Sequence, residues 1–75
     1  MTSFDTWART HNLIAVGSQL VFAARKDGVT RLFFVSMSVP LDVPSDEDPE
    51  SFMRSTWLAS AEKERERCRA QGWAA

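Results

Sequence analysis

"QLVFAARKDGVTRLFFVSMSV", residues 19–39, is the stretch that decides the fold. Asp27-Gly28 separates two hydrophobic runs in it, and this dipeptide supplies the positive φ that a tight hairpin turn needs. On both sides of the turn, apolar residues alternate with others, as in strands with two unequal faces. The pattern predicts two antiparallel strands, over about residues 18–25 and 29–39.

Both faces of this predicted hairpin carry large apolar side chains. In the second strand, one face holds Val29, Phe33, Val35, Met37 and Val39 with Arg31, and the other holds Thr30, Leu32, Phe34, Ser36 and Ser38. Val21 of the first strand shares the face of Leu32 and Phe34. Because helices packed on one side of a sheet leave its other side uncovered, we expect Val21, Leu32 and Phe34 on the uncovered face. Leu32 and Phe34 are therefore candidate partner-binding residues.

A short helix is predicted before the hairpin. Thr2, followed three residues later by Asp5, fits a capping box, and the apolar residues after it recur at helical spacing. The helix is expected over about residues 3–13. An alternative end lies at Val16, with Gly17 as the stop.

A linker and a long helix are predicted after the hairpin. Pro40 ends the second strand because proline cannot donate a ladder hydrogen bond, and residues 40–48 form the linker. Asp48 followed by proline is a strong helix-entry signal. The helix is expected over about residues 49–71, with Gly72 as its stop. Met53, Trp57, Ala61 and Cys68 form its apolar stripe.

Length and composition set the class of protein. Seventy-five residues make one domain, and 44% hydrophobic with 25% charged residues is typical of globular chains. The predicted fold is α+β: a small single domain, residues 1–75, with helix–β-hairpin–helix (αββα) order and an antiparallel two-stranded sheet. One cysteine, no secretory signal and no apolar run long enough to span a membrane predict a cytoplasmic protein without membrane contact.

The acidic stretch "VPSDEDPESFMRS", residues 43–55, has two interpretations. Acids beside a helix N-terminus interact favourably with its dipole, which accounts for Asp46, Glu47, Asp48 and Glu50 as a helix start. The same four residues could form an acidic docking patch for a basic partner surface. A calcium loop is excluded because the positions that require Gly and Glu hold Ser51 and Trp57.

The end of the long helix is strongly charged. Oppositely charged residues sit three apart, at Glu62–Arg65, Glu64–Arg67 and Glu66–Arg69. One interpretation is a solvated helix end that projects from the domain. The other is a partner contact anchored by Arg65, Arg67, Arg69 and Trp73, because Arg and Trp are enriched at binding hot spots.

The sequence contains few residues suited to catalysis or to cofactor binding. His11 is the only histidine and Cys68 the only cysteine, and a thiolate late in a helix is disfavoured by the helix dipole. Zinc sites need several Cys or His residues at close spacing, and phosphate loops need clustered glycines. We therefore expect no enzyme activity, no cofactor and no metal.

The leading expectation is a protein-binding module that modulates a larger protein or complex. In size and style the chain is similar to the small inhibitors and accessory proteins of phages and mobile elements. Two exposed strand edges favour a homodimer that extends the sheet to four strands. The alternatives are a dimeric nucleic-acid accessory factor using the three arginines of the helix end, which the net charge of −1 disfavours, and a structural assembly role.

Overall fold

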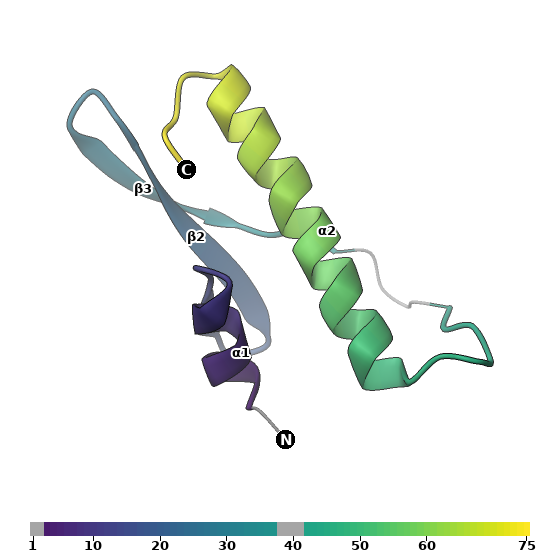
Figure 1. Cartoon of the computed structure of the whole chain (residues 1–75). Coiled ribbons are helices and arrows are strands. Elements are labelled where there is room, and N and C mark those ends of the chain that lie inside the picture. Colours follow the sequence, from purple (N-terminus) through teal and green to yellow (C-terminus); the bar gives the residue numbers. More distant parts are fainter. Residues whose placement is uncertain (1–2, 38–41) are drawn as a thin grey trace.

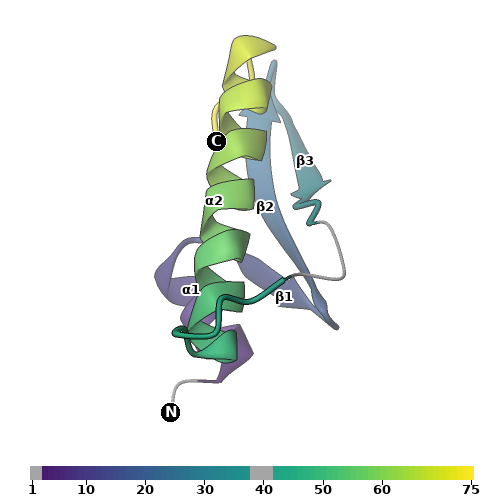
Figure 2. The same cartoon turned by 90° about the vertical axis from the view of Figure 1, so that its right-hand side faces the viewer.

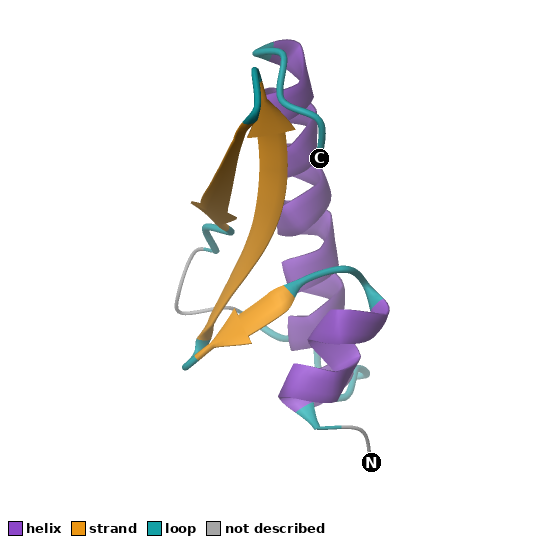
Figure 3. Ribbon diagram, turned by 90° about the vertical axis from the view of Figure 1, so that its left-hand side faces the viewer, coloured by secondary structure: helices purple, strands orange, loops and turns teal. Residues whose placement is uncertain are grey.

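The structure is a computed structural model that describes residues 3–37 and 42–75. Two helices, α1 (Phe4–Thr10) and α2 (Pro49–Ala70), accompany three strands: β1 (Ile14–Val16), β2 (Gln19–Lys26) and β3 (Val29–Phe34). The strands form an antiparallel sheet in the order β1-β2-β3 (Figure 1). Both helices lie on the same side of this sheet (Figure 3). The α+β class is confirmed, while the expected αββα order with a two-stranded sheet is wrong.

The additional strand, β1, directly follows the predicted helix of residues 3–13 and occupies the segment that the alternative helix end at Val16 would have included. The helix cap is Ser3 and not the expected Thr2, since the Ser3 hydroxyl accepts from the Thr6 N–H at 3.2 Å. The helix ends at Thr10, three residues earlier than expected, because Asn12 adopts a positive φ of 58°. The Leu13 N–H then donates to the Ala8 carbonyl, which closes a Schellman motif. The chain therefore turns back, and β1 pairs with β2.

The β2–β3 hairpin is confirmed, including its turn. Asp27 and Gly28 have φ values of 51° and 79°, as a two-residue hairpin turn requires. Strand β3 ends at Phe34 instead of near residue 39. The register limits the strand because β2 begins at Gln19, after the β1–β2 turn, so residues beyond Ser36 have no β2 residue opposite them. Predictions that concern residues 38–41, including Pro40, lie outside the described residues.

The hydrophobic core lies between the sheet and the two helices. From the sheet, Leu20, Phe22 and Ala24 point into it, and Phe33 stacks on Phe22 at 5.7 Å. From the helices come the buried side chains Trp7, Ala8, Trp57, Ala61 and Cys68. The expected stripe of α2 is thus confirmed, with Met53 partly buried against the core. We call the face of the sheet that packs on the helices the closed face.

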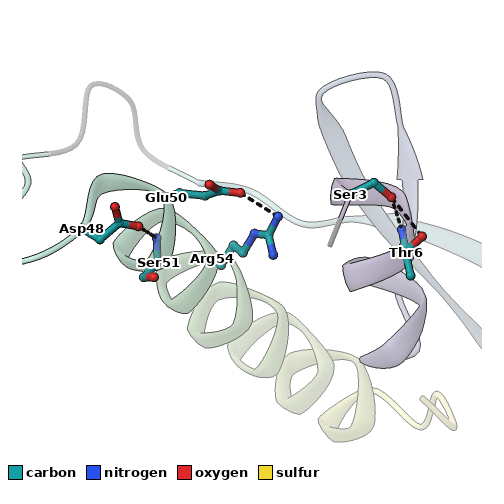
Figure 4. A network of polar contacts seen from close by, with 6 residues as sticks. All are labelled: Ser3, Thr6, Asp48, Glu50, Ser51 and Arg54. Atoms are coloured by element: carbon teal, nitrogen blue, oxygen red, sulfur yellow. Dashed lines mark hydrogen bonds and ion pairs between the residues drawn. The ribbon is translucent and has the colours of Figure 1, made fainter. Parts of the chain in front are cut away.

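Helix α2 begins and ends as the sequence predicts. The Asp48 carboxylate accepts from the Ser51 N–H at 3.0 Å, and Pro49 occupies the first turn (Figure 4). At the other end Gly72 has a φ of 92°, and the Trp73 N–H donates to the Cys68 carbonyl. This second Schellman motif turns the chain back alongside α2 (Figure 2). Ala74 then exchanges two backbone hydrogen bonds with Arg25 of β2.

Residues 3–37 and 42–75 contain two helices, α1 and α2. Of the two, neither is both long enough and apolar enough to cross a bilayer. The mostly apolar residues 14–24 belong to β1, β2 and the turn between them.

Candidate protein-contact surface

The face of the sheet opposite the closed face, which we call the open face, carries an apolar patch. Register places Ile14, Val21 and Phe34 in one row across the three strands, and Ala23 beside Leu32 in the next row. Directly paired residues point to the same face of a sheet. With Val16 at its margin, this open-face patch consists of Ile14, Val16, Val21, Ala23, Leu32 and Phe34.

The outer members of the open-face patch are strongly exposed. Leu32 and Phe34 expose 57% and 59% of their surface, and Ile14 and Val16 expose 48% and 50%. Val21, at the centre of the patch, is only 1% exposed. The sequence pattern placed Val21 on the correct face but at the surface. Ile14 and Phe34 flank it on the neighbouring strands.

Polar residues border this patch. Toward the hairpin turn the next row pairs Arg25 with Thr30, and at the opposite end Gln19 pairs with Val16. Arg25, Thr30 and Gln19 are all exposed. An exposed apolar patch with a polar rim is the surface pattern of protein–protein contact sites.

The acidic candidates lie at the start of α2, away from the hairpin turn (Figure 1). Asp48 caps the helix, and Glu50 pairs with Arg54 at 2.8 Å (Figure 4). Asp46 and Glu47 are exposed in the turn that precedes the cap. The helix-start interpretation therefore accounts for Asp48 and Glu50. The Glu47 N–H donates to the Pro44 carbonyl at 3.1 Å within this turn, and the helix-start interpretation gives the side chains of Asp46 and Glu47 no contact.

The three arginine candidates lie in the second half of α2 and make different contacts. Arg65 donates to the carbonyls of His11 and Asn12 at 3.2 and 3.1 Å, and its guanidinium lies 5.4 Å from the Phe22 ring centre. Arg67 pairs with Glu64 at 3.2 Å and Arg69 with Glu62 at 3.4 Å. Arg65 thus links α2 to the end of α1, and the charge of the other two is partly balanced by neighbouring acids.

Trp73 lies in the core rather than on the surface. It is 8% exposed and packs edge-on against Phe33 at 5.2 Å, with the Arg31 guanidinium 4.6 Å from its ring centre. Lys26 reaches across to the Gln71 carbonyl at 2.7 Å. The C-terminal end of α2 therefore does not simply project from the domain, because the residues after it pack on the sheet.

The titratable residues suited to catalysis lie apart in the structure. His11 is exposed at the end of α1 and contacts the Trp7 ring, whereas Cys68 is 4% exposed within α2. Burial, with a smaller contribution from Glu64, raises the pKa of the Cys68 thiol, which Arg67 partly opposes. Over residues 3–37 and 42–75, no three His, Cys, Asp or Glu side chains gather as metal ligands would.

Of the sequence-predicted candidates, the structure brings together Leu32 and Phe34, and it separates the acidic segment from the open-face patch. Ile14 and Val16 were missed because they lay outside the predicted strands, in the segment that the alternative helix end at Val16 would have included. A signal for them existed: the three residues before Gly17-Ser18 include two β-branched ones, Ile14 and Val16, and this dipeptide is typical of two-residue hairpin turns.

Comparison of the chain with protein-family models, with curated proteins and with solved structures finds no match. Similarity therefore assigns neither a family nor a function to it.

Proposed function

We propose that this chain is a non-enzymatic protein-binding module that modulates a larger protein through its open-face patch. It would act as an inhibitor or accessory protein of the kind that phages and mobile elements carry. Self-association into a homodimer is part of this proposal.

The observation that carries the proposal is the exposure of Leu32 and Phe34 beside Ile14. Removing apolar surface from water is favourable by roughly 25 cal/mol per Å², so covering these three side chains would contribute several kcal/mol to binding. The paired strands hold them in fixed register. A preformed surface loses little conformational entropy when it binds, which adds to its affinity.

The composition of the open-face patch fits a protein partner better than a nucleic acid. Its six members are uncharged, and Arg25 stands only at its rim. Nucleic-acid affinity depends mainly on cations placed against phosphates. The alternative function, a nucleic-acid accessory factor, would instead use Arg67 and Arg69 on α2, and the experiment separates the two.

The test is affinity capture from a host-type lysate, with and without nuclease, using three forms of the tagged protein. The first is the unchanged chain, the second carries Leu32→Ser and Phe34→Ser, and the third carries Arg67→Gln and Arg69→Gln. The proposal predicts a stoichiometric protein that survives nuclease and binds the first and third forms but not the second.

Two outcomes would contradict the proposal. Capture that disappears with nuclease and with the arginine variant would favour the nucleic-acid function. A partner that binds the serine variant as well as the unchanged chain would place the contact elsewhere on the molecule. Circular dichroism of each variant checks that its fold is retained.

A further inference from the structure

The outer edge of β3 is the feature from which we infer a specific geometry of self-association. We propose that β3 pairs antiparallel with β3 of a second copy of this chain, around a two-fold axis that sets Leu32 opposite the second copy's Leu32. This inference rests on the self-association included in the proposed function and specifies its edge and register.

The backbone of β3 presents alternate residues to this edge. The Val35 N–H donates to the Leu20 carbonyl at 2.8 Å, so these two residues form a hydrogen-bonded pair. In an antiparallel ladder, hydrogen-bonded and non-hydrogen-bonded pairs alternate. The N–H and C=O groups of Thr30, Leu32 and Phe34 therefore point away from β2, toward the outer edge.

The two edges of the sheet differ in how they are protected. On one side β2 is paired with the three-residue strand β1, and farther along Ala74 bonds to Arg25. On the other side β3 is the last strand in the sheet order and has six residues, with neither proline nor lysine among them. Such residues are the usual means by which proteins block edge pairing. Strand β3 is thus the edge that can accept another strand.

Charge selects the register of the pairing. In an antiparallel pair, residues whose N–H and C=O groups point toward the other strand must lie opposite one another. When all of β3 takes part in the pairing, the two-fold axis can therefore pass only through Arg31 or through Leu32. An axis through Arg31 would set two like charges directly opposite, which is destabilising. An axis through Leu32 sets Arg31 opposite Phe33 and Thr30 opposite Phe34, and no like charges face each other.

The resulting dimer would have a continuous six-stranded sheet, three strands from each copy. Edge pairing leaves the open face uncovered, and the two open-face patches would join across the axis, with Leu32 of each copy at the centre. A target protein would then meet one large apolar surface in place of two small ones.

Oxidative cross-linking tests the register. In a Cys68→Ala background, Leu32→Cys would place two thiols across a hydrogen-bonded pair, about 5.5 Å apart between Cα atoms, within disulfide range. In the same register Thr30→Cys would stand about 14 Å from its counterpart, because the two are offset by four residues at about 3.4 Å each. We expect covalent dimer from the first variant and none from the second.

Sedimentation equilibrium of charge variants tests whether the two-fold axis passes through residue 32. Leu32→Lys and Leu32→Glu should each weaken the dimer, raising its dissociation constant roughly tenfold or more. Mixing the two variants should restore the dimer, because the lysine at position 32 of one copy then faces the glutamate at position 32 of the other. The matched pair Ile14→Lys and Ile14→Glu, on the same face but far from the axis, should change the dissociation constant little and show no rescue.

The outcomes separate this inference from the proposed function. A dimer that cross-links equally at residue 30, or that shows no rescue on mixing, would overturn the register while leaving self-association intact. A chain that is monomeric at all concentrations would overturn the pairing altogether. Capture of a target by the open-face patch is measured independently and would survive either result.

Discussion

The two faces of the sheet carry similar apolar residues, but the helices bury those of the closed face and leave several of those on the open face exposed. On the closed face Phe22 is 2% exposed, and the helices, the C-terminal residues and Arg65 all contact it or its neighbours. On the open face Phe34 is 59% exposed. The amino-acid type is the same, and the strands are adjacent. The difference therefore reflects the number of helices available to cover a small sheet.

This contrast separates stability from function. Residues of the closed face hold the fold together, so their replacement should lower the free energy of unfolding. On the open face, Leu32 and Phe34 contribute little to stability, since more than half of the surface of each already contacts water. Replacing them should mainly change what the protein binds.

The largest effect is expected from Phe22→Ala. Loss of this ring, which stacks on Phe33 at 5.7 Å, leaves a cavity and should cost about 3–5 kcal/mol of unfolding free energy. Urea unfolding followed by circular dichroism measures the change. Phe34→Ala removes the same ring from the open face and should cost only about 0.5–1 kcal/mol. Equal losses would show that the two faces do not differ in this way.

An intermediate effect is expected from Arg65→Ala. Its guanidinium bonds to two carbonyls at the end of α1, and hydrogen bonds from charged donors contribute about 1–2 kcal/mol at a half-exposed site. Thermal unfolding measures the loss. The control is Arg67→Ala, whose side chain is 63% exposed and paired only at the surface, with an expected change near zero. A control as damaging as Arg65→Ala would argue against the link between the helices.

A smaller effect on stability is expected from Leu32→Ser combined with Phe34→Ser. Both side chains are exposed, so the unfolding free energy should fall by about 1 kcal/mol or less, mainly through lower strand propensity. Binding of an apolar fluorescent dye to the native protein should fall clearly. If dye binding stays unchanged, the open-face patch is not the accessible apolar surface that the exposures indicate.

The smallest effect concerns the Cys68 thiol. Because burial raises the pKa of Cys68, the unfolded chain loses this proton at lower pH than the folded one. The contribution to stability is present below the unfolded thiol's pKa and is lost as pH rises through the folded pKa. The unchanged chain should therefore lose slightly more stability at alkaline pH than Cys68→Ala. Parallel pH profiles for the two proteins would contradict this.

Local signals predicted the parts of the fold that depend on few residues. Asp27-Gly28 specified the hairpin turn, Asp48 and Pro49 the start of α2, and Gly72 its end. The stripe of α2 followed from helical spacing alone. Each feature is determined within a few residues of its own position, which is why the sequence indicates it.

The features that escaped prediction depend on pairing or packing with another element. Strand β1 has three residues and exists only because β2 lies beside it. Trp73 was expected at the surface, and its burial depends on docking against Phe33, forty residues away. Within the candidate site, the alternation of residues along the predicted strand correctly placed Leu32 and Phe34 on the uncovered face. Ile14 and Val16 were not placed there, because apolar residues in a short segment fit a helix and a strand equally well.

The return of the C-terminal residues to β2 has a consequence for the order of folding. The β2–β3 hairpin joins residues that are near in sequence and can form early. The Arg25–Ala74 bonds and the Arg65–His11 contact span about fifty residues and must close a long loop, which is slow. We expect refolding to show hairpin formation before burial of Trp73. Stopped-flow fluorescence of a chain with Trp73 as its only tryptophan would reveal the opposite order if it occurs.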